Sequence, residues 1–99
     1  MYELVITPEA ETDILMAFTW YEQRRTGLGH DFLLQMDAGF RSLERNPLIH
    51  SEKYAGVRCY LIRRFPYKVF YRVETGKIII LGVISGRRNP EWIKQRVQG

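Results

Sequence analysis

The sequence has a single cysteine, Cys59, among its 99 residues, so no internal disulfide can form. Its N-terminus lacks the basic and apolar segments of a signal peptide, and a chain without an export signal is expected in a reducing cytoplasm. No apolar run approaches the roughly 20 residues that a membrane-spanning helix needs, because Ile78–Ile84 has only the length of a strand. We therefore expect a cytoplasmic protein that does not associate with membranes.

Motifs for metal or cofactor chemistry are missing as well. One cysteine and two histidines do not make a ligand cluster, and neither a glycine-rich phosphate loop nor a nucleophile elbow occurs. Cys59 is expected to pack within a strand, because no histidine lies near it in the sequence to activate the thiol. We expect neither a metal ion nor a cofactor.

Charge of one sign is missing from the beginning of the chain. Residues 1–22 contain five acidic side chains and no base, whereas residues 53–96 contain eleven lysines and arginines and two acids. The net charge of +4 therefore conceals a strongly basic C-terminal half. Such a half favours an anionic partner, either a nucleic acid or an acidic protein segment. The alternative is a basic surface that only keeps the protein soluble.

The chain is organised around three strand patterns in its C-terminal half. These segments are rich in β-branched and aromatic residues and are separated by turn sequences: Val57–Arg64, Tyr67–Val73 and Lys77–Ile84. Their short connections favour an antiparallel meander. A further short strand, Tyr2–Ile6, is expected to join this sheet.

Two helical patterns precede the strands. Thr7 is expected to cap a helix that starts at Pro8, and its core-facing residues recur at helical spacing: Ala10, Ile14, Ala17, Phe18 and Tyr21. A second helix is expected from about His30 to Arg45, with Phe32, Met36, Phe40 and Leu43 on one stripe.

Asn46-Pro47 is expected to end the second helix, and residues 48–56 have no periodicity and are expected to form a loop. A short helix that begins at Pro90 and carries Trp92 and Ile93 is expected at the end of the chain. The prediction is one α+β domain over residues 1–99, in which an antiparallel αα-hairpin packs on an antiparallel sheet of three to four strands.

Arginines interleave with tyrosines along the predicted sheet, a pattern that can clamp phosphates and stack bases. Strand alternation places Arg58, Tyr60, Ile62 and Arg64 on one face. Arg63, Lys68 and Arg72 are interpreted as charges on a solvated face. For Arg58 and Arg64, a binding role and a structural role both stay open.

Several motifs occur in a characteristic order. They are YELVITPEA at the N-terminus, L-x-x-N-P after the hairpin, Gly56-Val57-Arg58, Arg64-Phe65-Pro66-Tyr67 and Arg87-Arg88-Asn89-Pro90. Together they resemble the RelE/ParE toxin superfamily over essentially the whole chain. The resemblance implies the toxin of a bacterial type II toxin–antitoxin pair, neutralised by a cognate antitoxin with an acidic, partly disordered C-terminal segment.

The superfamily divides by activity. RelE-like members are ribosome-dependent messenger RNA endonucleases that use basic residues of the sheet and often a tyrosine or histidine near the C-terminus, whereas ParE-like members inhibit DNA gyrase. Ser85 stands where many ParE-like relatives have a histidine, so no role is carried over from that histidine. The tail after Pro90 has neither tyrosine nor histidine, and the long helical hairpin looks more ParE-like. We therefore expect a ParE-like gyrase inhibitor. A RelE-like interferase acting on ribosome and mRNA is the alternative, and a toxin fold without activity is the third.

The candidate residues follow from this resemblance. Arg58, Arg64 and Arg87 match basic positions of the family sheet, and with Arg88 and Trp92 they are the predicted target-binding residues. In a nuclease, Arg58, Arg64 and Arg87 would stabilise phosphate charge and Tyr67 would join the catalytic set. Cleavage of RNA also needs a general base and a general acid, and the chain offers only Tyr60, Tyr67, Tyr71, Lys68 or a loop histidine.

Overall fold

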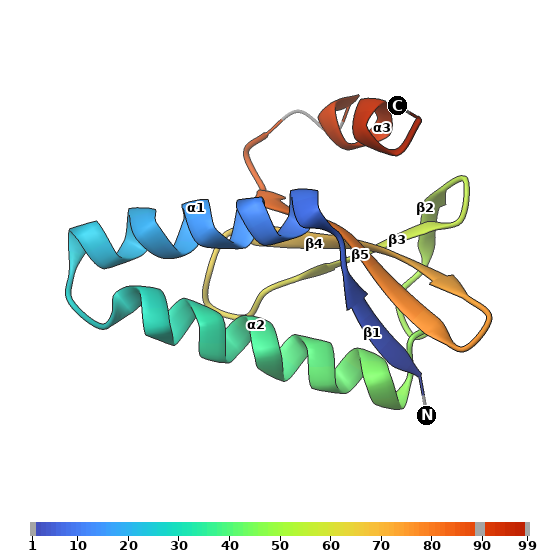
Figure 1. The fold of residues 1–99 in the computed structure, drawn as a ribbon, viewed down its shortest axis with the longest axis horizontal. Helices are drawn as coiled ribbons and strands as arrows, with labels where there is room; N and C mark the ends of the chain where they lie inside the picture. Colours follow the sequence, from blue (N-terminus) through green and yellow to red (C-terminus); the bar gives the residue numbers. More distant parts are fainter. Residues whose placement is uncertain (1, 89–90, 99) are drawn as a thin grey trace.

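The computed structural model describes residues 2–88 and 91–98. This part of the chain forms, in order, β1 (Glu3–Ile6), α1 (Pro8–Arg24), α2 (Leu28–Arg45), β2 (Glu52–Tyr54), β3 (Val57–Leu61), β4 (Tyr67–Glu74), β5 (Lys77–Ser85) and α3 (Glu91–Gln98) (Figure 1). The α+β class and the helical hairpin are confirmed. No helix within the described ranges has the length and apolar character of a membrane span.

The sheet is larger than predicted and is mixed. Its order is β1-β5-β4-β3-β2, and β2 to β5 form an antiparallel meander, whereas β1 pairs with β5 in parallel. β2 lies in the segment that was expected to be a loop. It folds back on β3 through Ala55 and Gly56, whose φ values of 45° and 79° are typical of a tight hairpin turn. Alanine at such a position gives little sequence signal for a turn.

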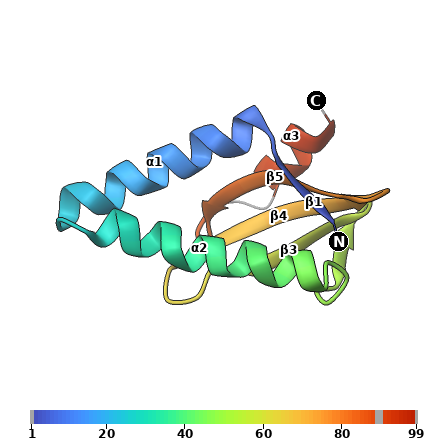
Figure 2. The same cartoon turned by 60° about the horizontal axis from the view of Figure 1, so that its bottom comes forward.

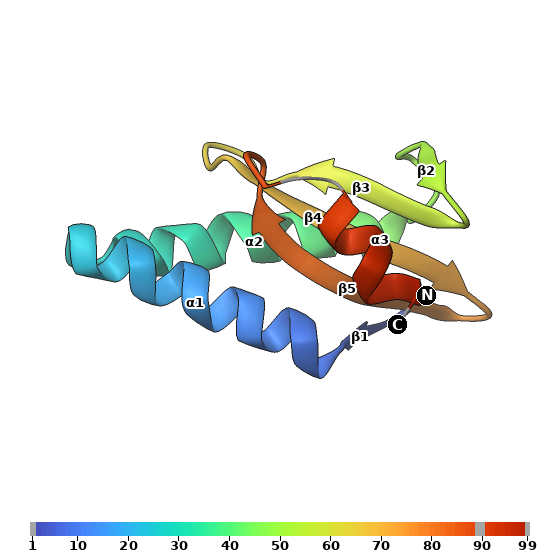
Figure 3. The same cartoon turned by 90° about the horizontal axis from the view of Figure 1, so that it is seen from above.

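Helices cover both faces of the sheet. α1 and α2 lie side by side along one face (Figure 2), and α3 crosses the other face (Figure 3). The larger core, under the hairpin, includes the predicted α2 stripe of Phe32, Met36, Phe40 and Leu43, all of which are buried. The smaller core, under α3, consists of Val57, Phe70, Ile84 and Ile93. The short C-terminal helix is therefore part of the packed domain.

A β-bulge in β5 lies where α3 packs on the sheet. Phe70 of β4 pairs with Gly82, whereas the next residue, Tyr71, pairs with Ile80, so Leu81 is an extra residue on β5. A Cβ atom at Gly82 would lie 2.9 Å from Cδ1 of Ile93. Glycine at this position therefore lets α3 approach the sheet closely, since any side chain would have to displace the end of the Ile93 side chain.

The start of α1 follows the prediction. The hydroxyl of Thr7 accepts a hydrogen bond from the Ala10 N–H (3.2 Å) and donates one to the Ile80 carbonyl (2.8 Å). One side chain thus caps the helix and ties its first turn to β5. α2 begins at Leu28, two residues earlier than expected, because Gly27 at φ 90° turns the chain directly into it.

Glu22 is expected to make the turn between α1 and α2 sensitive to acid. Its carboxylate accepts the N–H groups of Gly27 and Gly29, each at 2.9 Å, and the Gly27 bond is the main reason that the pKa of Glu22 lies below its ordinary value. A depressed pKa in the folded state adds stability above the unfolded-state pKa, and this stability is lost as the pH falls through the folded-state value. The urea midpoint should therefore fall less between about pH 7 and about pH 3 in Glu22→Gln than in the unmodified chain.

Glu74→Gln is the matched control for this prediction, because Glu74 is an exposed carboxylate at the end of β4. Its pH dependence of unfolding should stay close to that of the unmodified chain. An equal change in the two variants would show that the Glu22 contacts do not govern acid sensitivity.

Candidate functional site

A groove of about 840 Å³ runs between the outer side of α1, the end of β5 and α3. The wall formed by α1 is apolar, since Met16 and Trp20 are 62% and 47% exposed. The opposite wall carries Arg87, Arg88 and Trp92. A large aromatic and aliphatic surface thus faces two cations across an open groove, an arrangement typical of protein-binding surfaces.

Four of the predicted site residues meet in this groove. Tyr67, Arg87, Arg88 and Trp92 all line it, although they come from β4, from the segment after β5 and from α3. The guanidinium carbon of Arg88 lies 4.6 Å from the centre of the Trp92 ring, within the range of a cation–π contact. The structure therefore brings together the C-terminal part of the predicted set.

The other two predicted residues lie outside the groove. Arg58 donates a hydrogen bond from Nη1 to the carbonyl of His50 at 2.7 Å, so its guanidinium holds the loop before β2. Arg64 is exposed in the turn between β3 and β4, at φ 73°. The prediction that Arg58 and Arg64 share a strand face is wrong, because β3 ends at Leu61 and the chain turns before Arg64.

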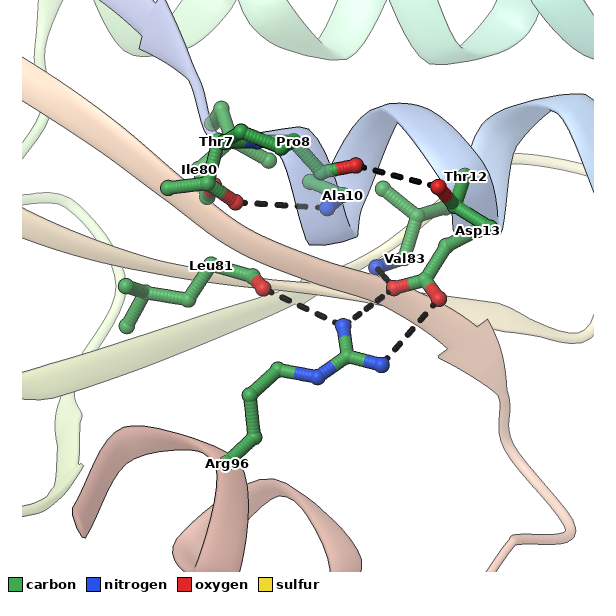
Figure 4. Close-up of polar contacts among 9 residues, drawn as sticks. All are labelled: Thr7, Pro8, Ala10, Thr12, Asp13, Ile80, Leu81, Val83 and Arg96. Carbon is green, nitrogen blue, oxygen red and sulfur yellow. Dashed lines mark hydrogen bonds and ion pairs between the residues drawn. The ribbon is translucent and has the colours of Figure 1, made fainter. Parts of the chain in front are cut away.

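The floor of the groove contains an open edge of β5, and side chains form hydrogen bonds with the backbone groups of that edge. β1 pairs with β5 only as far as Ile80, so within the described part of the chain the edge of β5 that faces away from β4 has no neighbouring strand from Leu81 onward. Asp13 accepts the N–H of Val83 at 3.0 Å, and Arg96 donates to the Leu81 carbonyl at 3.3 Å (Figure 4). These contacts satisfy backbone groups that an edge strand would otherwise expose to the groove.

Asp13 and Arg96 also bind each other. The Nη1 of Arg96 lies 2.6 Å from Oδ2 of Asp13, and its Nη2 lies 3.2 Å from Oδ1 (Figure 4). The pair is largely shielded from water, since the Arg96 side chain is 19% exposed and the Asp13 side chain is 9% exposed. The guanidinium carbon of Arg96 is also 3.9 Å from the centre of the Trp92 ring. This latch, defined as the Asp13–Arg96 ion pair, connects α1, the β5 edge and α3.

Comparison with known proteins identifies the family. A family model described as "ParE toxin of type II toxin-antitoxin system, parDE" matches residues 4–90. The chain belongs to the ParE toxin family. A search of curated proteins returns no match.

Two solved structures show the same fold as this ParE-family chain. A chain of the chromosomal ParDE TA system from P. aeruginosa has a TM-score of 0.76 and 19% identity, and the match covers 86% of this chain and 96% of that one. The isolated E. coli RelE toxin has a TM-score of 0.62 and 12% identity, with 99% and 98% covered. The membership in the RelE/ParE superfamily and the α+β fold are thus confirmed.

Sequence reasoning missed the α1 wall of the ParE-family groove. Met16 and Trp20 are apolar but stand outside the predicted core stripe of α1, and both are exposed. Large apolar residues on the polar side of an amphipathic helix were the available signal, because a helix that packs on one side only needs none there.

Proton-transfer chemistry has little support in this ParE-family chain. Burial raises the pKa of Tyr67 and of Tyr71, and it raises that of Tyr60 most strongly. A tyrosine with a raised pKa is protonated at neutral pH and is a poor general base. His50 stacks on the Tyr60 ring at 5.6 Å rather than lining the groove. Within the described residues, no group of three or more His, Cys, Asp or Glu side chains could hold a metal ion.

Proposed function

We propose that this ParE-family toxin inhibits DNA gyrase and is neutralised by the acidic segment of a cognate antitoxin that binds in the groove between α1 and α3. The observation that carries the proposal is the groove itself, in which exposed Met16 and Trp20 face Arg87 and Arg88. Arginine and tryptophan are the residues that most often dominate binding energy at protein interfaces.

The two walls of the groove define the chemistry of the antitoxin segment. Its apolar side chains would cover Met16 and Trp20, and its carboxylates would approach Arg87 and Arg88, which have no carboxylate within ion-pair distance among the described residues. An amphipathic helix laid in a groove makes this combination of contacts. A disordered segment that folds on binding would cover the apolar wall, and the unpaired arginines would attract it.

Family membership and site chemistry favour gyrase over messenger RNA as the target. The likeness to RelE lies in the fold, and the described part of the groove contains no tyrosine or histidine with a pKa suited to proton transfer. Of the three arginines expected to stabilise phosphate charge, only Arg87 lies in the groove, since Arg58 binds the His50 carbonyl. A RelE-like interferase would need its base and acid from elsewhere.

Purified toxin assayed separately on gyrase and on translating ribosomes tests the proposal. We expect the toxin to block supercoiling and to leave messenger RNA intact. The double variant Arg87→Ala, Arg88→Ala should raise the inhibitory concentration by about thirtyfold or more, since two anchor residues are lost. Point variants are preferable to truncation, because Ile93 of α3 is fully buried and removing the helix would expose the core beneath it.

Arg63→Ala is the matched control, because Arg63 is exposed and lies outside the groove. It should inhibit gyrase like the unmodified toxin. Messenger RNA cut at codon boundaries, with supercoiling unaffected, would reject gyrase inhibition in favour of the interferase.

A further inference from the structure

A second pocket, of about 250 Å³, lies between α3 and the sheet and shares Ile84, Ser85 and Arg88 with the lining of the groove. We call it the α3 pocket. Its apolar part is formed by Phe70, Ile84 and Ile93, which belong to the smaller core. Its polar and reactive residues come from five elements and from the segment after β5: Lys53, Tyr54, Cys59, Lys68, Ser85, Arg88 and Lys94.

The cations of the α3 pocket outnumber its anions. Lys94 pairs with Glu91 at 3.3 Å, whereas Lys53, Lys68 and Arg88 have no carboxylate within ion-pair distance among the described residues. Lys68 and Lys53 both lie close enough to Cys59 to pull the pKa of its thiol down, although burial outweighs them and raises it overall. Glu91 supplies one negative charge near Tyr54, so the positive charges of Lys53, Lys68 and Arg88 still exceed the negative charge around the pocket.

The α3 pocket also contains an unused hydrogen-bond donor. The hydroxyl of Tyr54 is buried and has no hydrogen-bond partner among the described residues. Burial raises the pKa of Tyr54, so its hydroxyl keeps its proton and can donate. Buried polar groups of folded proteins nearly always have partners, and an exception calls for an explanation such as a missing ligand.

We propose that the α3 pocket binds the phosphoryl group of a nucleotide. Three unpaired cations match the double negative charge of a terminal phosphoryl group better than the single charge of a carboxylate. Lysine binds phosphate as a point charge, and the phosphoryl oxygens accept hydrogen bonds from both lysine and the Tyr54 hydroxyl. A volume of 250 Å³ is below that of ordinary drug-sized sites, so the ligand is a mononucleotide or the 5′-terminal nucleotide of a strand.

Protection of Cys59 from a thiol reagent tests this inference on the full chain, because Cys59 lines the α3 pocket and is the sole cysteine. The probes are inorganic phosphate and a nucleoside 5′-monophosphate, each compared with chloride at equal ionic strength. We expect saturable protection by both probes. Lys68→Gln should raise the half-saturating concentration of each probe by about tenfold or more, since a charge-assisted contact is lost. Lys77→Gln, an exposed lysine outside the pocket, should leave it unchanged.

Tyr54→Phe gives an independent readout that does not depend on the lysines. Removing a buried hydroxyl without a partner should raise the melting temperature of the ligand-free protein. The same variant should gain less thermal stabilisation from phosphate than the unmodified chain, because the ligand loses a donor. A purely structural role for Tyr54 would not produce these opposite changes. A lower melting temperature of the ligand-free variant would contradict the inference.

Short oligonucleotides distinguish the two sources of the phosphoryl group. Protection by the mononucleotide identifies a metabolite, whereas protection only by a 5′-phosphorylated oligonucleotide identifies the end of a strand, and either result supports the inference. Equal protection by a 5′-hydroxyl oligonucleotide overturns it, because the pocket would then bind the backbone. Protection by every phosphorylated probe that is no greater than that by chloride, or protection that is undiminished in Lys68→Gln, also overturns it. None of these assays contains gyrase, so the result is independent of the proposed function.

Discussion

Replacing Asp13 by alanine is expected to lower the free energy of unfolding by about 3–5 kcal/mol, the usual cost of breaking a shielded ion pair from one side. The substitution leaves the Arg96 guanidinium, whose side chain is only 19% exposed, without its carboxylate. It also leaves the N–H of Val83 without its acceptor. Because domains of this size are stable by only about 5–15 kcal/mol, the loss is a large fraction of the total.

Urea denaturation followed by circular dichroism measures this loss, and hydrogen exchange locates it. The amide of Val83 should exchange faster in Asp13→Ala, since the edge of β5 is no longer protected and α3 is held less firmly. A double variant, Asp13→Ala with Arg96→Met, should recover part of the stability, because no unpaired charge remains in the shielded site.

The matched control for the latch is the exposed pair Asp37–Arg41 on α2. Its atoms lie 3.3 Å apart, and the Arg41 and Asp37 side chains are 59% and 53% exposed. Asp37→Ala should leave the urea midpoint almost unchanged, because solvent screens an exposed pair. If Asp13→Ala behaves like Asp37→Ala, the latch does not stabilise the fold.

Local sequence patterns predicted most of the fold because the physics behind them is local. The α2 stripe from Phe32 to Leu43 is buried as its helical spacing requires, and Thr7 caps α1 as its position before Pro8 indicates. The parallel pairing of β1 escaped prediction, because the alternation of side chains in a strand does not specify the direction of its partner. β2 is three residues long, too short to show any periodicity.

The candidate site was less predictable because long-range packing builds it. Arg87, Arg88 and Trp92 were found through sequence motifs, and they do meet in the groove. Asp13 and Arg96 are 83 residues apart, and no local pattern links an acid in the first helix to a base in the last one. The α3 pocket depends likewise on β2 and α3 meeting over the sheet, which cannot be known before the fold.

Trp20→Ala is expected to weaken the binding of the cognate antitoxin by about thirtyfold or more, which corresponds to a loss of roughly 2 kcal/mol or more. The Trp20 ring is 47% exposed on the α1 wall and carries the guanidinium of Arg24 at 3.4 Å from its centre. The ring is therefore held in place but has apolar surface to bury against a partner. Trp92 is a less informative choice, because it packs against the smaller core and its loss would also disturb α3.

Calorimetric titration of the toxin with its cognate antitoxin measures the dissociation constant, and growth of cells that express both proteins gives a second readout. Leu34→Ala is the matched control, since Leu34 is 68% exposed on α2 and lies outside the groove. It removes similarly exposed apolar surface and should leave the dissociation constant unchanged. The antitoxin should still rescue growth in Leu34→Ala cells and fail to do so in Trp20→Ala cells. Equal dissociation constants for the two variants would place the antitoxin elsewhere on the toxin, because a segment seated between α1 and α3 must cover Trp20.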